Sequence, residues 1–325
     1  MYLRNNRYVF VRHHINIVSK INGVGLDQDV RLLTRTLQSQ GFKVTFSEHK
    51  GMKSAWRYCQ RAHRYDANIF IERFFPCWTG LAANNFVIPN QERFPARILK
   101  PLKKHCNGVL CKTRHAQNIF SAHTHTAEYI GFTSQNKYRS GIDKNYSEFF
   151  HLAGKSSVKG TEDILALWAL HPEWPRLTLV QHPDKAPGSV PANVNLLAER
   201  LSDTDLSQLQ NSIGIHLCLS RSEGWGHYIA EAMSTGAVVI TTDGEPMNEL
   251  VNSTRGVLVK SERSEKRHLG TNYFFDAQSL EKKIRRLITT TDEEKVRLGE
   301  QARHWFKENE AQFGPRLAAA IKRLI

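Results

Sequence analysis

Residues 220–233 read Ser-Arg-Ser-Glu-Gly-Trp-Gly-His-Tyr-Ile-Ala-Glu-Ala-Met, and the fold is decided here. The apolar run Ile213–Ser220 precedes this stretch and predicts a buried strand, and a helical pattern follows over Tyr228–Ser234. Between them, Gly224 and Gly226 permit backbone conformations that bring amide groups close to a ligand. The start of the helix adds unpaired N–H groups and the positive end of its dipole. Strand, glycine loop and helix in this order predict a phosphate-binding turn.

Two carboxylates accompany the glycine loop. Glu223 lies at the end of the strand, and Glu231 lies on the following helix. Because a carboxylate can accept two hydroxyl hydrogen bonds at once, it suits the diol of a ribose or a hexose. The stretch therefore predicts a site for a phosphorylated sugar.

The same alternation of short strands and helices runs through the whole chain. In the second half we expect strands at Phe149–Ala153, Leu177–Gln181 and Ala237–Thr242, and helices at Gly160–Leu170 and Asp203–Asn211. In the first half we expect strands at Tyr8–His13, Lys43–Ser47, Ala67–Glu72, Phe86–Pro89, Gly108–Lys112 and Tyr129–Thr133, and a helix from Leu26 that stops at Gly41. Such alternation is typical of parallel α/β sheets, whose ligands bind at the carboxyl ends of the strands.

The length of the chain predicts two domains, because 325 residues exceed what one hydrophobic core usually holds. The polar stretch Ser134–Ser147 marks the boundary. We therefore expect two doubly wound, parallel-sheet α/β domains facing a central cleft, over residues 1–145 and 146–305. The tail from Glu293 to Ile325 is predicted to be helical, with a break near Gly314-Pro315.

Charge is distributed unevenly over these domains. The formal net charge is +14, and the whole excess of basic residues lies in residues 1–150. Such a half attracts anionic partners, namely phospholipid headgroups, acidic glycans or nucleic acid, although a merely solubilising surface would look the same. Nucleic acid is disfavoured, because no helix-turn-helix, zinc-finger or RNA-binding motif accompanies the charge.

Cysteine usage and hydropathy indicate the cellular compartment in which the protein works. The five cysteines are odd in number and none has CxxC spacing, which argues against a disulfide framework and a zinc site. His115, His123 and His125 have no acidic or cysteine partner at ligand spacing, so no metal site is predicted. Because no apolar run approaches the length of a membrane span, we expect a cytoplasmic protein.

The run from Asp203 to Val251 resembles the donor-binding signature of GT-B retaining glycosyltransferases, in particular glycosyltransferase family four. The hallmark of that family is two glutamates separated by seven residues, which Glu223 and Glu231 match. The resemblance implies two Rossmann-like domains, with Glu223 contacting hydroxyls of the transferred sugar and Glu231 holding the ribose of the nucleotide. It also implies that the donor is bound by the loop and helix start, which comprise Gly224, Trp225, Gly226, His227 and Tyr228.

A second segment, His151–Gly160, resembles the first strand and helix start of the family's donor domain. The resemblance implies that Lys155 and Lys159 neutralise the diphosphate leaving group, whose departure fixed positive charges stabilise. The chain departs from the family in having Lys155 where Arg is commoner, and in a spacing to Lys159 that is one residue shorter. Because Lys lacks the bidentate fork of Arg, the resemblance implies the diphosphate role more strongly for Lys159 than for Lys155.

In the first half the resemblance is architectural. The turn Asn22-Gly-Val-Gly25 lies where the family has a glycine loop near the donor phosphates, which implies donor contacts for Gly23 and Gly25. His115, Asn90 and Glu92 follow N-terminal strands, and we expect them on the acceptor side of the cleft. The resemblance further implies that residues 306–325 form a helix that packs back on the N-terminal domain, the alternative being an amphipathic membrane-facing stripe.

Taken as a whole, the resemblance implies retaining transfer of a hexose from a UDP- or GDP-linked sugar to a glycan or glycolipid acceptor. The expected setting is the assembly of bacterial surface polysaccharide or lipopolysaccharide, in the cytoplasm or at the inner face of the membrane. No cofactor or metal ion is expected, since basic residues and a helix end supply positive charge. The alternative is a non-catalytic GT-B-like module that binds an anionic glycan or nucleic acid. A dinucleotide-dependent oxidoreductase is disfavoured, because no GxGxxG motif follows the first strand.

Overall fold

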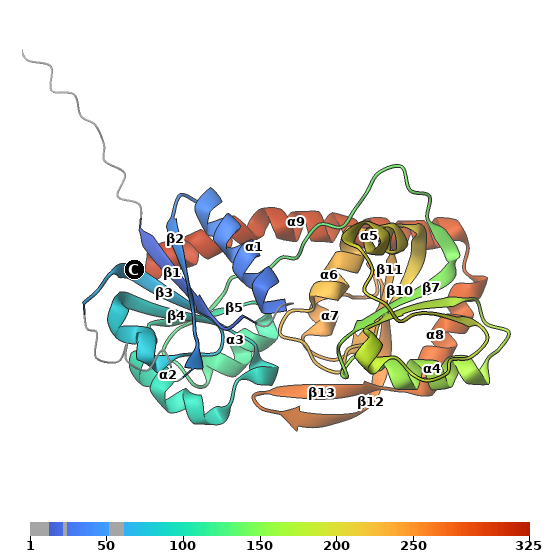
Figure 1. The fold of residues 1–325 in the computed structure, drawn as a ribbon, viewed down its shortest axis with the longest axis horizontal. Coiled ribbons are helices and arrows are strands. Elements are labelled where there is room, and N and C mark those ends of the chain that lie inside the picture. The colour runs from blue at the N-terminus through green and yellow to red at the C-terminus, as the bar shows by residue number, and fades with distance from the viewer. Residues whose placement is uncertain (1–12, 22–24, 52–61) are drawn as a thin grey trace, which may run out of the picture.

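The structure is a computed structural model that describes residues 13–21, 25–51 and 62–325. These residues form two α/β domains that lie next to each other, each built around one sheet (Figure 1). The long helix α9 (Asp292–Leu324) runs along both domains. No helix in these described ranges is both long and apolar enough to cross a membrane.

The N-terminal sheet has the strand order β2-β1-β3-β4-β5-β6, and all of its pairings are parallel. Its strands are β1 (His14–Ser19), β2 (Lys43–Glu48), β3 (Tyr65–Glu72), β4 (Ala82–Pro89), β5 (Gly108–Cys111) and β6 (Ala127–Tyr129). The helices are α1 (Gly25–Ser39), α2 (Leu99–His105) and α3 (Arg114–Ser121), with short 3₁₀ turns η2 (Pro76–Leu81), η3 (Gln91–Arg93) and η4 (Ala96–Ile98). The strand expected at Tyr8–His13 lies outside the described residues except for His13, and β1 begins one residue later.

The strand predicted over Tyr129–Thr133 is wrong, because β6 ends where that prediction begins. The chain leaves the sheet at Gly131, whose φ is +69°. Ile130 and Phe132 are buried for a different reason: they join a hydrophobic cluster that spans both domains. An apolar run cannot distinguish burial in a strand from burial in such an interface.

The C-terminal sheet has the order β13-β12-β11-β10-β7-β8-β9 and is parallel except for its edge pair. Its strands are β7 (Asn145–Gly154), β8 (Leu177–Gln181), β9 (Val194–Leu197), β10 (Ile213–Cys218), β11 (Val238–Asp243), β12 (Val257–Arg267) and β13 (Gly270–Phe275). Its helices are α4 (Thr161–Leu170), α5 (Asp203–Ser212), α6 (His227–Ser234), α7 (Met247–Leu250) and α8 (Ala277–Thr289), with the 3₁₀ turn η5 (Pro183–Lys185). The strands and helices expected in this half, including the strand–loop–helix at Ile213–Ser234, are confirmed to within a few residues.

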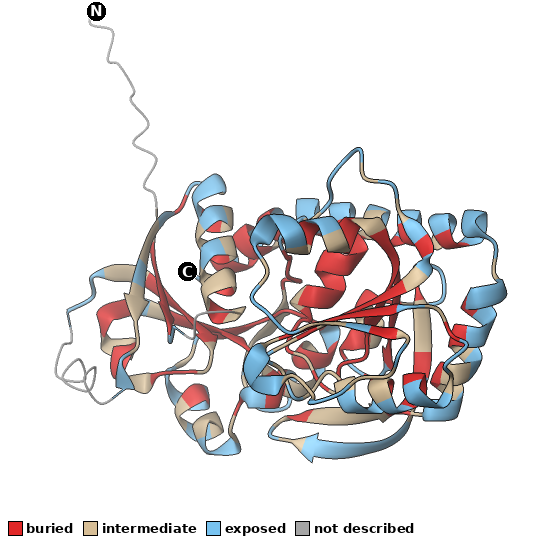
Figure 2. Cartoon of the chain, turned by 45° about the vertical axis from the view of Figure 1, so that its right-hand side comes forward, coloured by how far each residue is buried: buried red, intermediate tan, exposed pale blue. Residues whose placement is uncertain are grey.

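The antiparallel hairpin β12–β13 was not foreseen in the sequence. Its outer part is mostly exposed (Figure 2), and it extends from the C-terminal domain toward the N-terminal domain (Figure 1). At its tip, the N–H of Leu269 donates to the carbonyl of Gln91 over 3.1 Å. The Leu269 side chain packs against the hydrophobic cluster of the N-terminal domain that contains Phe94. The hairpin thus connects the two domains at one edge of the cleft.

The break predicted near Gly314-Pro315 is wrong, since α9 continues through Pro315. A proline inside a helix removes one backbone hydrogen bond and disfavours the turn before it. Here Phe313, Leu317 and Ile321 are buried on either side of it, and they join the inter-domain cluster. At its end, Arg323 pairs with Glu128 of β6 over 2.8 Å, so the last turns of α9 contact the N-terminal domain.

Candidate active site

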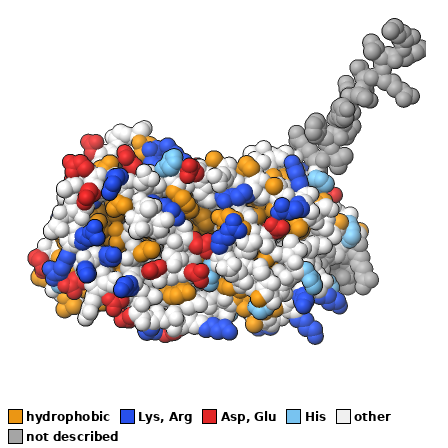
Figure 3. Space-filling view, turned by 180° about the vertical axis from the view of Figure 1, so that it is seen from behind, with side chains coloured by type: hydrophobic (Ala, Val, Ile, Leu, Met, Phe, Trp, Pro, Cys, Tyr) orange, Lys and Arg blue, Asp and Glu red, His pale blue; other side chains and the backbone are white. Residues whose placement is uncertain are grey.

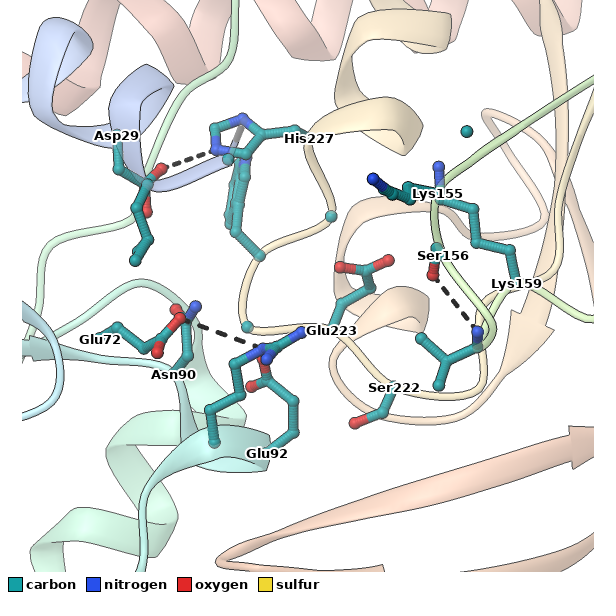
Figure 4. A pocket seen from close by; sticks show the side chains of 18 of the residues that line it. Asp29, Glu72, Asn90, Glu92, Lys155, Ser156, Lys159, Ser222, Glu223 and His227 are labelled. Carbon is teal, nitrogen blue, oxygen red and sulfur yellow. Dashed lines mark hydrogen bonds and ion pairs between the residues drawn. The ribbon is translucent and has the colours of Figure 1, made fainter. Parts of the chain in front are cut away.

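A cavity of about 520 Å³ lies between the two domains. On the N-terminal side it is lined by the start of α1 and by residues at or just beyond the ends of β3, β4 and β5. On the C-terminal side it is lined by the segment 152–159 and by the glycine loop before α6 (Figure 4). These are carboxyl ends of parallel strands, which is where α/β sheets place their ligand sites.

The glycine loop has the tight geometry expected from its sequence. Gly226 has a φ of +98°, in the left-handed region that favours glycine. Gly224 lies so close to the N-terminal domain that a Cβ there would collide with the Asn90 side chain. The Trp225 side chain is buried, donates its indole N–H to Ser134 Oγ over 3.1 Å and packs edge-on against Phe132. Both glycines and Trp225 line the cavity, and the indole serves mainly to anchor the loop in the core.

Glu223 faces the cavity from this loop. Its Oε1 accepts a hydrogen bond from Ser220 Oγ over 2.6 Å. Burial raises the pKa of Glu223, and the Ser220 hydrogen bond and the charge of Lys159 offset part of that rise. Ser220 Oγ is also 2.7 Å from the hydroxyl of Tyr228, which is buried. Tyr228 therefore supports Glu223 through Ser220 and lies behind the cavity wall.

Lys159 and Lys155 lie at the same wall but in different surroundings. Lys159 Nζ donates to the carbonyl of Leu152 over 2.7 Å and lies 3.9 Å from the centre of the Tyr228 ring. Burial lowers the pKa of Lys159, and the charge of Glu223 opposes that shift. Lys155, in contrast, is 60 % exposed and pairs with Asp184 over 3.1 Å. The cation held beside Glu223 is thus Lys159, and Lys155 lies at the rim.

Glu231 is directed to the other domain. Its Oε1 accepts a hydrogen bond from Gln28 Nε2 of α1 over 2.7 Å, and the residue is buried. Glu231 lies one turn behind His227 on α6, outside the set of described residues that line the cavity. The structure therefore separates the two glutamates of the motif: Glu223 faces the cavity, and Glu231 bridges the domains beside it.

A buried ion pair on the N-terminal side was not predicted from the sequence. Lys112 Nζ lies 2.7 Å from Asp29 Oδ2, and the two side chains are only 2 % and 4 % exposed. His227 Nε2 lies 2.7 Å from Asp29 Oδ1, while its Nδ1 lies 2.8 Å from Ser134 Oγ. Burial alone would raise the pKa of Asp29, but the charges and hydrogen bonds of Lys112 and His227 outweigh it and lower the pKa to about 2.

Sequence signals for this pair exist. Asp29 precedes Leu33 by four positions, and so it lies on the apolar face of an otherwise amphipathic helix. Lys112 directly follows the buried strand β5. A charged residue at a buried position needs a partner, and these two satisfy each other.

The predicted acceptor-side residues divide into two groups. Asn90 and Glu92 line the cavity, and Asn90 Oδ1 accepts a hydrogen bond from Lys112 Nζ over 3.1 Å. His115 is instead engaged at the domain interface, with its Nδ1 2.8 Å from Glu245 Oε2 and its backbone N–H donating to Glu249 Oε1 over 2.6 Å. Glu249 also accepts the N–H of Arg114, so it caps α3 from the other domain.

The glycines of the N-terminal turn are placed only in part. Gly25 begins α1 and lines the cavity, while Gly23 lies outside the described residues.

Comparison with known proteins agrees with this architecture. Residues 190–305 match the sequence model of the family described as Glycosyl transferases group 1. No curated protein sequence gives a significant match to the chain.

Solved structures match over nearly the whole chain. A glycosyltransferase from Rickettsia africae superposes with a TM-score of 0.70 at 12% identity, covering 97% of this chain and 98% of its own. HepE from Anabaena, in complex with UDP and glucose, gives 0.68 at 15% identity over 96% and 100% of the two chains. Sucrose-phosphate synthase from Thermosynechococcus elongatus gives 0.68 at 14% identity over 96% and 98%.

Identities this low establish the fold alone, whereas the family match covers the segment that carries the glycine loop and both motif glutamates. The fold expected from the sequence is therefore confirmed: the chain has the GT-B fold, and its residues 190–305 are similar to the sequence model of the group 1 glycosyltransferases.

Proposed function

We propose that the chain is a retaining, metal-independent glycosyltransferase that moves a hexose from a nucleoside diphosphate sugar to a glycan or lipid-linked acceptor. One observation carries the proposal: the glycine loop, the start of α6, Glu223 and Lys159 converge on one wall of the inter-domain cavity. This wall combines hydrogen-bond acceptors for sugar hydroxyls with positive charge for a diphosphate.

The chemistry assigned to this wall is stabilisation of the leaving group. When the bond between the anomeric carbon and the phosphate oxygen breaks, negative charge develops on the nucleoside diphosphate. Lys159 and the amides at the start of α6 provide fixed positive charge and dipoles for it, in a partly buried site where electrostatic effects are strong. Glu223 would accept hydrogen bonds from hydroxyls of the transferred hexose.

A UDP-linked hexose is the donor to test first, with GDP-linked sugars as the alternative. The support comes from the HepE structures, whose complexes contain UDP, glucose and UDP-glucose. In this proposal Glu231 contributes to holding the ribose, and it would do so from beside the cavity together with Gln28.

The excess of basic residues in the N-terminal half suits an anionic acceptor or an anionic membrane surface. On the back of the molecule, acidic side chains are sparser over the N-terminal domain than over the C-terminal domain (Figure 3). Lys100, Lys103 and Lys104 lie together on α2. We infer a cytoplasmic enzyme of bacterial surface polysaccharide or lipopolysaccharide assembly that contacts the inner face of the membrane. Co-sedimentation with vesicles tests the contact: salt-sensitive binding that requires anionic lipid supports it, and equal recovery with neutral vesicles refutes it.

The donor is tested by thermal-shift measurements with UDP-, GDP-, ADP- and dTDP-sugars, followed by an assay of nucleoside diphosphate release. We expect at least one nucleotide sugar to stabilise the wild type, and Glu223→Gln to reduce turnover strongly. Glu262→Gln, which removes an exposed carboxylate from the hairpin, is the control and should behave like the wild type. If no nucleotide sugar stabilises the wild type, the proposed function is wrong.

A further inference from the structure

A second cavity, of about 370 Å³, lies at the domain interface, and the proposed reaction does not use it. Arg114 at the start of α3 and Tyr129 at the end of β6 line it from the N-terminal domain. Glu249 of α7 lines it from the C-terminal domain. The helix α9, which runs along both domains (Figure 1), contributes Trp305 and Arg316. A ligand in this cavity would therefore contact both domains.

Two guanidinium groups of this cavity lie beside the same aromatic ring. The guanidinium carbons of Arg114 and Arg316 lie 3.9 and 5.3 Å from the centre of the Tyr129 ring. Arg114 Nη1 donates to the neutral amide of Gln117 over 2.8 Å. Arg316 Nη2 donates to the neutral amide of Asn309 over 2.9 Å, and its Nε is buried without a hydrogen-bond partner in the described part of the chain. Neither arginine forms an ion pair with any residue that the structure describes.

The two carboxylates that line the cavity are engaged elsewhere. Both oxygens of Glu249 accept backbone N–H groups at the start of α3, from Arg114 over 2.8 Å and from His115 over 2.6 Å. Glu308 is exposed, and its Oε1 lies 3.1 Å from Nε2 of His304, one turn earlier on α9. The positive charge of the two arginines is therefore not balanced by an ion pair within the cavity, which can accept an anion.

The chemistry of this cavity suits a phosphate monoester. A guanidinium group presents its N–H donors in a planar fork that matches the oxygen atoms of a phosphate. A phosphate monoester carries close to two negative charges near neutral pH, which matches two arginines without ion-pair partners. For the organic part of the ligand, Trp225, Leu250 and Trp305 provide apolar surface and Gln312 provides a polar amide. The volume of about 370 Å³ lies within the range of small-molecule sites.

The second cavity shares a residue with the donor cavity. Trp225 lines both, and its indole anchors the glycine loop that carries Glu223. A ligand that binds Arg114 and Arg316 while it contacts Glu249 and Trp225 adds contacts between the docked domains. This docked arrangement is also the one that encloses the donor cavity. By linkage, a ligand that stabilises it also strengthens donor binding.

We propose that the second cavity is a regulatory site that binds a phosphate monoester of about hexose size and that favours donor binding when it is occupied. The phosphate oxygens accept hydrogen bonds from Arg114 and Arg316, and the organic part lies against Trp305. The ester is bound and released without chemical change. Its binding is independent of the proposed function, whereas its effect on the donor rests on that function.

Isothermal titration without any nucleotide sugar tests the binding. The probes are glucose 1-phosphate, glucose 6-phosphate and inorganic phosphate, with glucose as the uncharged control. We expect at least one ester to bind the wild type more tightly than inorganic phosphate does, and glucose not to bind. Arg114→Ala removes an exposed guanidinium but keeps the backbone N–H that Glu249 accepts, and it should weaken ester binding about tenfold or more. Arg316→Lys, which keeps the charge but loses the fork, should also weaken it.

Two further variants locate the bound ester. Arg97→Ala removes an exposed arginine of η4 that lines neither cavity, and Lys159→Ala removes the buried cation of the donor cavity. Both should bind the ester as the wild type does. If no ester binds the wild type, or if binding survives both Arg114→Ala and Arg316→Lys, the proposal is overturned. Loss of binding in Lys159→Ala would place the ester in the donor cavity, which also overturns it.

The effect on the donor is measured by titrating the stabilising nucleotide sugar with and without saturating ester. We expect the ester to lower the dissociation constant for the donor about fivefold in the wild type and to leave it unchanged in Arg114→Ala. An unchanged dissociation constant in the wild type overturns the regulatory role. If no nucleotide sugar binds with or without the ester, the proposed function fails and the regulatory role fails with it. The ester titration alone still decides whether the second site exists.

Discussion

The two walls of the cavity hold their charged groups in different ways. After the roles proposed for them, we call residues 152–159 and 220–227 the donor wall, and Asp29, residues 90–93 and Lys112 the acceptor wall. On the donor wall, Glu223 and Lys159 are held by groups of their own domain, Ser220 Oγ and the Leu152 carbonyl. On the acceptor wall, the Asp29 carboxylate of α1 is held by Lys112, which directly follows β5, and by His227 from the other domain. The donor wall is therefore built locally, whereas the acceptor wall depends on the docking of the two domains.

The largest effect should come from removing the buried cation of the donor wall. We expect Lys159→Ala to lower turnover about 100- to 1,000-fold, because a fixed charge facing the leaving group is lost from a partly buried site. Lys155→Ala is the matched control from the same segment. Since Lys155 is exposed and already paired with Asp184, its loss should change turnover less than about threefold.

Steady-state release of nucleoside diphosphate measures both variants. Equal losses of turnover in the two variants would show that Lys155 moves to the donor on binding. In that case the difference in burial between the two lysines would not predict their contributions to catalysis.

The next largest effect should be on stability, at the acceptor wall. Asp29→Asn keeps the size of the side chain but leaves Lys112 buried without a counter-charge, so we expect the free energy of unfolding to fall by about 3–5 kcal/mol. Asp27→Asn, on the same helix, should cost less than about 1 kcal/mol. Urea denaturation at neutral pH measures both. A loss as small as that of the Asp27 variant would mean that water reaches Lys112 and that the pair is not buried in solution.

The same ion pair predicts a pH dependence. The pKa of Asp29 is lowered in the folded state to about 2, below its ordinary value near 4, so the folded state binds the proton less tightly than the unfolded state does. The resulting stabilisation is complete above about pH 4 and is lost as the pH falls toward 2, by about 2 kcal/mol in all.

Unfolding measured between pH 5 and 2 should show this loss in the wild type and lack most of it in Asp29→Asn. Parallel pH profiles for the two proteins would contradict the assignment.

The smallest effect should be on donor affinity, at the contact between Glu231 and Gln28 across the domain boundary. Glu231 accepts a hydrogen bond from Gln28 across the domain boundary. If it also holds the nucleotide, Glu231→Gln should raise the dissociation constant for the donor about tenfold, as expected for loss of one charge-assisted hydrogen bond. Gln28→Ala should weaken donor binding less, because the carboxylate remains. Isothermal titration with the stabilising nucleotide sugar measures both, and undiminished binding by Glu231→Gln would exclude the ribose contact.

The difference between the walls also explains how far the sequence could predict the site. The glycine loop, Glu223 and Glu231 lie within a dozen residues, so their strand–loop–helix context is visible as a local pattern. Asp29 and Lys112 are separated by 83 positions, and each alone looks like an ordinary charged residue. Their pairing follows only from the way α1 packs beside the end of β5.

Two local features escaped prediction for other reasons. The part of β12 from Lys260 to Arg267 is a run of charged residues and serines, and it lacks the apolar alternation that marks a half-buried strand. Pro315 predicted a helix break, yet the buried side chains around it keep α9 continuous across both domains. In both cases tertiary packing outweighed the local signal, and both elements connect the two domains.

The proposed function requires that the donor wall binds a nucleoside diphosphate sugar between the domains. A crystal structure of the protein with the nucleotide sugar that stabilises it most would test this directly. We expect the diphosphate to lie at the start of α6 within reach of Lys159, and the hexose to lie beside Glu223 and to face the acceptor wall. A nucleotide sugar bound outside this cavity, or bound with its diphosphate away from α6 and Lys159, would contradict the claim.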